Sequence, residues 1–160
     1  DIAMRMKIRG EPRQPLAVNL REIDAGPALT LDGLTATAFD VEHYPLDQPF
    51  GYRFATPERV IVHSGDTCPS ENLIRHARGA DLLVHECMDD AAWDNPEIDH
   101  GKTDRSHTSP GNLSRIATEA EAGLLVATHL NPGTRPETMA QTIGEGFSGP
   151  VVIGEDLMTL

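Results

Sequence analysis

Three potential metal ligands follow strand-like segments of this sequence. Asp66 and His129 each come shortly after an apolar run that is typical of a buried strand, and His43 ends a third strand-like stretch, residues 35–42. Polar groups at strand ends are where α/β folds collect their chemistry, and zinc accepts both carboxylate and imidazole ligands. The three side chains therefore predict a metal site that the fold assembles from distant parts of the chain.

The predicted site is only partial. The sequence has no cluster of the form H-x-H-x-D-H that would supply further ligands. Three ligands cannot complete two coordination spheres, because each zinc ion takes about four donors. Structural alternatives also stay open for each residue. Asp66 could cap its turn, His129 could be a core histidine, and His43 could be a turn residue ahead of Pro45.

Composition narrows the class of protein. The length of 160 residues suits a single domain, and 39% hydrophobic residues can fill one core. No apolar run is long enough to span a membrane, and no signal-peptide pattern follows Asp1. The formal net charge of −12 opposes binding to nucleic acid, whose phosphates require a basic surface. Cys68 and Cys87 suggest small buried residues rather than a disulfide framework, which favours a reducing compartment such as the cytoplasm.

The pattern of elements predicts a layered α/β sandwich that occupies residues 1–160 as one domain. A β-rich first third is followed by alternating strands and helices, with Ser70 and Ser109 as helix caps. The expected segments are a weakly structured lead-in at 1–15, β structure over 16–54, a helix over 70–79, a strand over 81–86, a loop over 88–106, a helix over 109–123, a strand over 124–127, a helix over 136–145 and a strand over 151–153.

Five short stretches carry a resemblance to a known family. From about Leu16 onward the chain resembles the C-terminal half of a metallo-β-lactamase-fold hydrolase, in the ribonuclease Z and arylsulfatase-like branch. Each stretch is weak alone, but their order and spacing together are specific. They are Glu42-His43 with Phe50-Gly51-Tyr52-Arg53, Ser64-Gly65-Asp66-Thr67, Gly79-Ala80-Asp81-Leu82-Leu83-Val84-His85-Glu86, His107-Thr108-Ser109 and Thr128-His129.

The resemblance implies roles for five residues in an αββα sandwich. It implies that His43 binds one divalent metal ion, that His129 binds the other and that Asp66 bridges both. The two ions are expected to be zinc, with manganese or iron as alternatives. It also implies that Glu86 and His107 form a dyad near the bond to be cleaved, with Asp66 contributing to catalysis through the bridged metals.

The chemistry of these residue types agrees with the implied roles. Two bound metals lower the pKa of a bridging water, and a histidine oriented by a glutamate can protonate a leaving group. Glu86 would then fix the tautomer of His107. Glu86 could instead be a partner of a backbone amide, and His107 could belong to a helix cap. The remaining histidines are interpreted as structural, with His85 on the opposite side of its strand, or as surface residues at 63, 76 and 100.

The chain departs from the family pattern because the N-terminal half is absent. The sheet face that this half would cover is expected to be bare, which a soluble monomer rarely tolerates. We therefore expect a fragment, or one part of an assembly, whose missing half lies upstream or in a companion chain. Association with a second copy is another way to cover such a face. Alone, the chain is expected to be inactive.

A second departure concerns the substrate. Ribonuclease Z enzymes of bacteria carry a tRNA-gripping arm between the Gly-Tyr-Arg stretch and the Gly-Asp-Thr turn, but only residues 54–63 separate Arg53 from Ser64 here. With the negative charge, this favours a small-molecule sulfate, phosphate, carboxylic or lactone ester over nucleic acid. The alternatives are a tRNA 3′-processing endonuclease, a non-catalytic half-fold binding module, and a redox sensor that uses Cys68 and Cys87.

Overall fold

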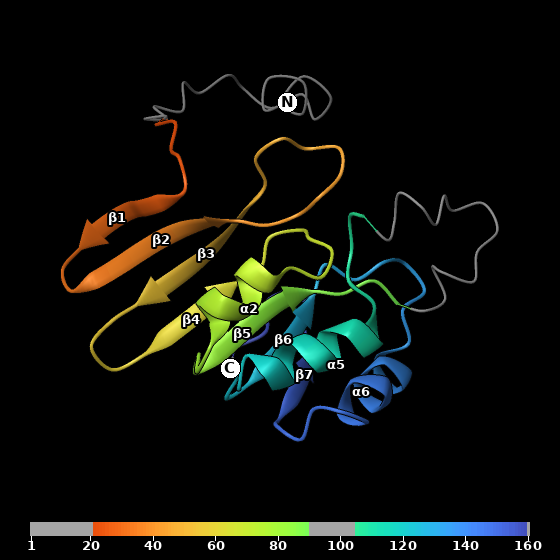
Figure 1. Ribbon diagram of the computed structural model, residues 1–160. Coiled ribbons are helices and arrows are strands. Elements are labelled where there is room, and N and C mark those ends of the chain that lie inside the picture. Colours follow the sequence, from red (N-terminus) through yellow and green to blue (C-terminus); the bar gives the residue numbers. More distant parts are fainter. Residues whose placement is uncertain (1–20, 90–104, 160) are drawn as a thin grey trace, which may run out of the picture.

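The structure, a computed structural model, describes residues 21–89 and 105–159. This part of the chain forms one seven-stranded sheet whose strands lie in chain order, with three helices (Figure 1). The elements are β1 Gly26–Leu31, β2 Leu34–Asp40, β3 Phe50–Ala55, β4 Val60–His63, α2 Glu71–Ala77, β5 Leu82–Glu86, α5 Pro110–Glu119, β6 Leu125–Thr128, α6 Pro136–Gly144 and β7 Val151–Ile153.

The sheet changes from antiparallel to parallel at β4. Strands β1 to β4 pair antiparallel, and β4 to β7 pair parallel. Parallel neighbours need a crossover connection, and α2, α5 and α6 supply the three crossovers. The carboxyl ends of β4, β5 and β6 consequently meet at the same edge of the sheet. The segments that follow these strands are therefore brought together.

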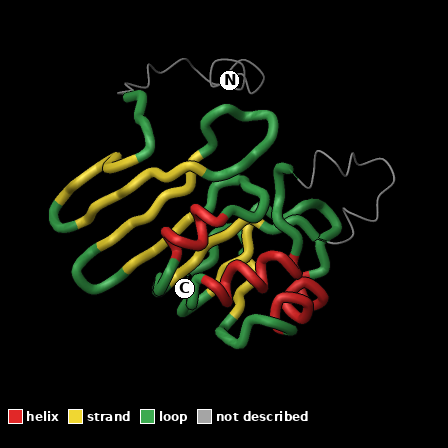
Figure 2. Tube along the Cα trace, in the orientation of Figure 1, coloured by secondary structure: helices red, strands yellow, loops and turns green. Residues whose placement is uncertain are grey.

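The three helices pack on one face of the sheet (Figures 1 and 2). Val62, Leu83 and Leu125 are fully buried, lie in register on neighbouring strands, and form the core with Leu73 of α2 and Ile116 of α5. This burial removes apolar surface from water and is the main stabilising contribution of the layer. The arrangement is an α/β layer, in agreement with the predicted fold class.

The opposite face of the sheet is apolar. Ile61 is in register with Phe54 and leaves 40% of its surface exposed, and Tyr52 stacks on Phe54 with ring centroids 6.2 Å apart. Val84 follows on β5 with the same orientation, because side chains alternate along a strand. Within the described residues, no helix covers this face (Figure 1). No helix in this part of the chain is long and apolar enough to cross a membrane.

The predicted helix starts are confirmed. The side chain of Ser70 accepts a hydrogen bond from the Leu73 N–H, and that of Ser109 accepts one from the Asn112 N–H, each at 3.4 Å. The prediction that α5 continues to residue 123 is wrong, since the helix ends at Glu119. Glu121 there adopts a φ of 53°, a left-handed conformation that cannot continue a helix.

The prediction of β structure throughout 16–54 is also partly wrong. Strand β2 ends at Asp40, and residues 41–49 form a loop that a hydrogen bond from the Val41 N–H to the Pro49 carbonyl closes at 3.1 Å. The predictions for the lead-in at 1–15, for residues 16–20, for most of the loop at 88–106 and for His100 lie outside the described residues.

Candidate functional site

The five predicted site residues come from five segments of the chain. Asp66, Glu86 and His129 lie at or just past the carboxyl ends of β4, β5 and β6. His43 lies in the loop after β2, and His107 lies just before α5. The parallel half of the sheet thus supplies three of these side chains to one edge, and the two loops add the other two.

Three histidine rings form a row at this edge. The ring centroids of His43 and His107 are 5.1 Å apart, and those of His107 and His129 are 5.7 Å apart. At the end of the row, Nε2 of His129 lies 3.6 Å from Oδ2 of Asp66. The side chains of His129 and Asp66 keep 52% and 42% of their surface exposed. The structure therefore brings together all three predicted metal ligands, with His107 between them.

The hydrogen bond of His43 suits a metal ligand. The Nδ1–H of His43 donates to the Ser106 carbonyl at 2.7 Å, so the Nε2 lone pair remains available. A ligating histidine usually donates its other N–H to such an oxygen. Within residues 21–89 and 105–159, however, no three His, Cys, Asp or Glu side chains converge closely enough to hold a metal ion. The donor types fit a metal site, but the described residues do not complete one.

The carboxylate of Glu86 ties two loops of the site to the sheet. Its Oε1 accepts hydrogen bonds from the Thr67 N–H at 3.1 Å and the Thr108 N–H at 3.0 Å. Thr108 Oγ1 also donates to the Thr67 carbonyl at 2.8 Å. The alternative that Glu86 is a partner of backbone amides is thus observed, and it coexists with a contact to His107. The Gly-Asp-Thr turn and the His-Thr-Ser stretch are held against each other by this one side chain.

Glu86 and His107 form a close buried pair. Nδ1 of His107 lies 3.3 Å from Oε1 of Glu86, whose side chain is 1% exposed. Contact with the Glu86 carboxylate raises the pKa of His107, and burial raises the pKa of Glu86. Among the described residues, neither Oε2 of Glu86 nor Nδ1 of His107 has a hydrogen-bond partner, so the two side chains meet as an ion-pair contact rather than a formed hydrogen bond. The pair can therefore hold a proton at His107 and orient that ring.

Two further residues fix the backbone of Glu86. Its N–H donates to Ser64 Oγ at 3.0 Å, and its carbonyl accepts from the Nδ1–H of His85 at 2.6 Å. His85 lies on the helix side of the sheet and is fully buried, as expected for a structural residue. Burial lowers its pKa to about 4, so its ring is neutral near pH 7.

Backbone geometry explains two positions in the strand-end motifs. Gly65 has a φ of 64°, and a Cβ there would collide with the carbonyl of Phe50. His129 has a φ of 55°, which a non-glycine residue seldom adopts. Strained backbone of this kind is frequent at functional sites, because surrounding contacts are needed to maintain it.

Within the described residues, the remaining histidines and the two cysteines lie outside the histidine row. His63 is exposed, as predicted, but His76 is only partly exposed and stacks on Phe39 at 4.3 Å, so its assignment to the surface is incomplete. Cys68 and Cys87 are both buried, as predicted. Burial raises the pKa of Cys68, which disfavours a reactive thiolate and the redox reading.

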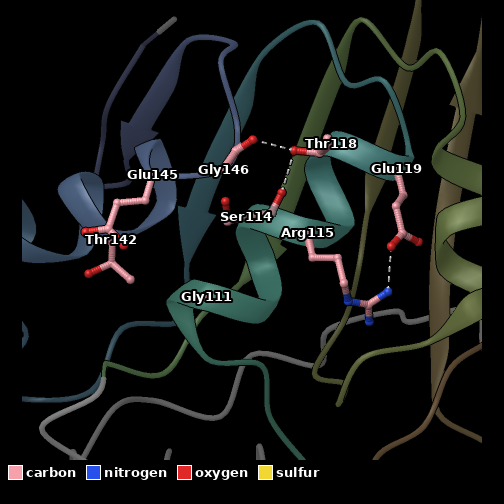
Figure 3. A pocket seen from close by; sticks show the side chains of 8 residues that line it. All are labelled: Gly111, Ser114, Arg115, Thr118, Glu119, Thr142, Glu145 and Gly146. Carbon is pink, nitrogen blue, oxygen red and sulfur yellow. Dashed lines mark hydrogen bonds and ion pairs between the residues drawn. The ribbon is translucent and has the colours of Figure 1, made fainter.

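A hollow between α5 and α6 lies apart from this site (Figure 3). Ser114 Oγ donates to the Ile143 carbonyl at 2.6 Å, and Thr118 Oγ1 lies 2.9 Å from the Ser114 carbonyl and 3.1 Å from the Gly146 carbonyl. These polar groups are therefore satisfied within the protein. The hollow is a seam between packed helices rather than a candidate active site.

Sequence comparison identifies the family of this chain. A family model described as a β-lactamase superfamily domain matches residues 2–130. Ribonuclease Z of Mycobacterium tuberculosis strain H37Rv is 31% identical over 162 residues, which cover 98% of this chain and 59% of that protein. Ribonuclease Z of Mycolicibacterium paratuberculosis is 29% identical, with coverage of 98% and 58%. The chain thus spans less than two thirds of the length of these relatives.

Solved structures share the fold. A metallo-β-lactamase fold protein from Bacillus subtilis superposes with a TM-score of 0.66 at 27% identity, covering 79% of this chain and 49% of that one. The short form of human tRNase Z superposes with a TM-score of 0.59 at 24% identity, covering 82% and 43%. The chain therefore belongs to the β-lactamase superfamily and has the metallo-β-lactamase fold.

Proposed function

We propose that this chain forms part of a metal-dependent hydrolase that cleaves an ester bond. The proposal rests on the row of His43, His107 and His129. Asp66 lies beside His129 at one end of the row, and Glu86 contacts His107, the central ring. The row combines metal-type donors with a proton-holding histidine. Such a combination is what hydrolysis by an activated water requires.

The residues that would hold metal are His43, Asp66 and His129. His43 would use Nε2 toward one ion, His129 would use Nε2 toward the other, and the carboxylate of Asp66 would bridge both. Two divalent ions, zinc in the first instance, would supply an activated water and neutralise charge on the attacked group. The further donors would come from a missing N-terminal half or a companion chain, which would also cover the apolar sheet face.

His107 is proposed to move the proton. Glu86 raises its pKa, so a protonated ring can give a proton to the leaving group or stabilise a developing oxyanion. Glu86 itself stays in place because two backbone N–H groups hold its Oε1. The pair therefore acts as an oriented acid rather than as a metal ligand.

A small-molecule ester fits the described residues best as substrate. Strands β3 and β4 are joined by Thr56–Arg59, and the Thr56 N–H donates to the Arg59 carbonyl at 2.9 Å, which makes a tight turn. This turn leaves no inserted arm between Arg53 and Ser64. The net charge of −12 also weakens attraction to a polyanion.

A second candidate function is 3′ processing of tRNA. The curated relatives carry the name ribonuclease Z, and one structural neighbour is named a tRNase Z. These names weigh against the expectation that nucleic acid is not a partner. The discriminating observation is whether the protein cleaves a precursor tRNA faster than a small ester. The cytoplasmic location rests on the two cysteines and stays a prediction.

Metal content is the first test of the proposal. Elemental analysis of the full-length protein that carries this chain is expected to give about two zinc, manganese or iron ions per chain after dialysis. A panel of p-nitrophenyl acetate, phosphate and sulfate esters and a precursor tRNA then identifies the bond. Loss of turnover with EDTA and its return with zinc is expected. A metal-replete protein that cleaves none of these would favour the non-catalytic binding module.

A further inference from the structure

An arginine guanidinium is held on an aromatic ring beside the histidine row. The guanidinium carbon of Arg105 lies 4.2 Å from the ring centroid of Tyr44, a cation–π contact. Stacking of this kind fixes the plane of the guanidinium and leaves the N–H groups on its edge able to donate. Within residues 21–89 and 105–159, Arg105 makes no ion pair that would use those donors. It is an oriented cation in a strongly acidic chain.

Arg105 lines a pocket that also contains His43. The pocket has a volume of about 320 Å³, which suits a small molecule. Glu42 and Asp47 line the same pocket, so it contains two carboxylates besides the guanidinium. This mixed charge disfavours a polyanion but allows a single anionic group to bind at the guanidinium. Among the described lining residues Arg105 is the one arginine or lysine, so an anionic group of a ligand in this pocket would bind there.

Contacts between residues 43–44 and residues 105–106 connect the pocket to the histidine row. We call these contacts the loop strap. The Tyr44 N–H donates to the Arg105 carbonyl at 3.0 Å, and Ser106 Oγ donates to the Tyr44 carbonyl at 2.8 Å. His43 donates to the Ser106 carbonyl at 2.7 Å. A group bound at Arg105 would therefore lie at a fixed position relative to His43 and to His107, the residue after Ser106.

We propose that Arg105, held on Tyr44, is an anchoring residue for an oxyanion group that the substrate carries beside the ester to be cleaved. The group can be a carboxylate, phosphate or sulfate, because each matches the forked donors of a guanidinium. The assignment rests on the proposed hydrolase function and refines its substrate to an anionic small-molecule ester. Specificity then comes from Arg105, whereas the histidine row carries the reaction.

Binding without metal tests the anchoring role independently of turnover. Monomethyl succinate, which carries a carboxylate beside its ester, is titrated calorimetrically into the full-length protein that has been made metal-free with EDTA and then dialysed to remove the chelator. R105Q is expected to weaken binding by about tenfold. R105K is expected to weaken it by less, since lysine keeps the positive charge but lacks the paired N–H donors of a guanidinium. R78Q removes the same charge at the end of α2, far from the strand carboxyl ends, and is expected to bind like wild type. Equal affinity of R105Q and wild type would overturn the proposal.

Kinetics separate anchoring from a purely structural strap. With zinc restored, R105Q is expected to raise KM about tenfold for mono(p-nitrophenyl) succinate and to leave p-nitrophenyl acetate unchanged. Equal loss of kcat on both esters would mean that Arg105 only supports the loops, and would overturn the anchoring role while leaving the hydrolase intact. If the wild-type protein binds monomethyl succinate through Arg105 but cleaves no ester, the anion-binding role of Arg105 is supported and the proposed hydrolase function is rejected.

Discussion

Nδ1 of His107 lies 3.3 Å from Oε1 of Glu86, the same oxygen that accepts hydrogen bonds from two backbone amides. One carboxylate atom thereby orients an imidazole and joins two loops. Removing Glu86 would consequently affect both the proton chemistry and the architecture of the site. Substitutions that keep the acceptor but change the charge can separate the two effects.

Glu86→Ala is expected to destabilise the fold far more than Glu86→Gln. Alanine leaves the buried N–H groups of Thr67 and Thr108 without an acceptor, at a cost of about 1–3 kcal/mol each. Glutamine retains an oxygen at that position and is expected to lose less than half as much. Urea unfolding followed by circular dichroism measures the difference. Equal unfolding midpoints for the two variants would contradict the tethering role.

His107→Ala is expected to slow turnover by about two to four orders of magnitude while metal content stays at the wild-type level. The loss arises because the leaving group no longer receives a proton from an oriented donor. Elemental analysis and steady-state kinetics on the same preparations are the measurements. His76→Ala, a change on α2 beside Phe39, is the matched control and is expected to keep full turnover.

Asp66→Ala is expected to remove turnover and to weaken retention of both metal ions. Its carboxylate faces Nε2 of His129 and is the one proposed donor that would serve both ions. Metal retained after dialysis against a weak chelator is the direct measurement. The exposed Glu58 in the β3–β4 turn provides the control substitution Glu58→Ala. Two metals retained by the Asp66 variant would show that the bridging role is wrong.

His85 is expected to make the fold sensitive to acid. Its folded-state pKa of about 4 lies below the ordinary value of 6.5, so the unfolded chain takes up a proton first as the pH falls. Stability from this group is complete above pH 6.5 and is lost progressively between pH 6.5 and pH 4, by up to about 3 kcal/mol.

Comparing wild type with His85→Asn isolates this contribution from that of the carboxylates. The free energy of unfolding is measured by urea titration at several pH values across the window. The variant is less stable than wild type near neutral pH, and the difference is expected to shrink toward pH 4 because asparagine does not titrate. A difference that stays constant across the window would show that His85 titrates normally in the folded protein.

Much of the fold was predictable because its signals are local. Ser70 and Ser109 cap helices through hydrogen bonds to residues three positions ahead, so both the residue type and the spacing are visible in the sequence. The loop at 41–49 has local signals too, because Pro45, Asp47 and Pro49 are typical of turns and rare inside strands. The order and register of the parallel strands were not predictable in this way, because they depend on contacts between segments far apart in the sequence.

The residue types of the site were predictable from the sequence, but the hydrogen bonds and contacts that connect them were not. His43, Asp66, Glu86, His107 and His129 do gather at one sheet edge. Their places at strand ends indicated this for His43, Asp66 and His129, and the family resemblance implied it for Glu86 and His107. The hydrogen bonds from the Thr67 and Thr108 amides to Glu86 had no signature, because every residue except proline carries a backbone N–H. The contact between Arg105 and Tyr44 was likewise missed, because residues 61 positions apart in sequence show no local pattern.

The loop strap has a consequence for how this protein could diversify. It is held by main-chain atoms of Tyr44, Arg105 and Ser106, together with one serine hydroxyl and one ring nitrogen. Exchanging the side chains at positions 44 and 105 would therefore leave the placement of His43 and His107 nearly unchanged. Evolution or laboratory selection can thus change which ligand the pocket binds without moving the histidine row. Positions 44 and 105 are expected to change together in variants that have acquired new substrates.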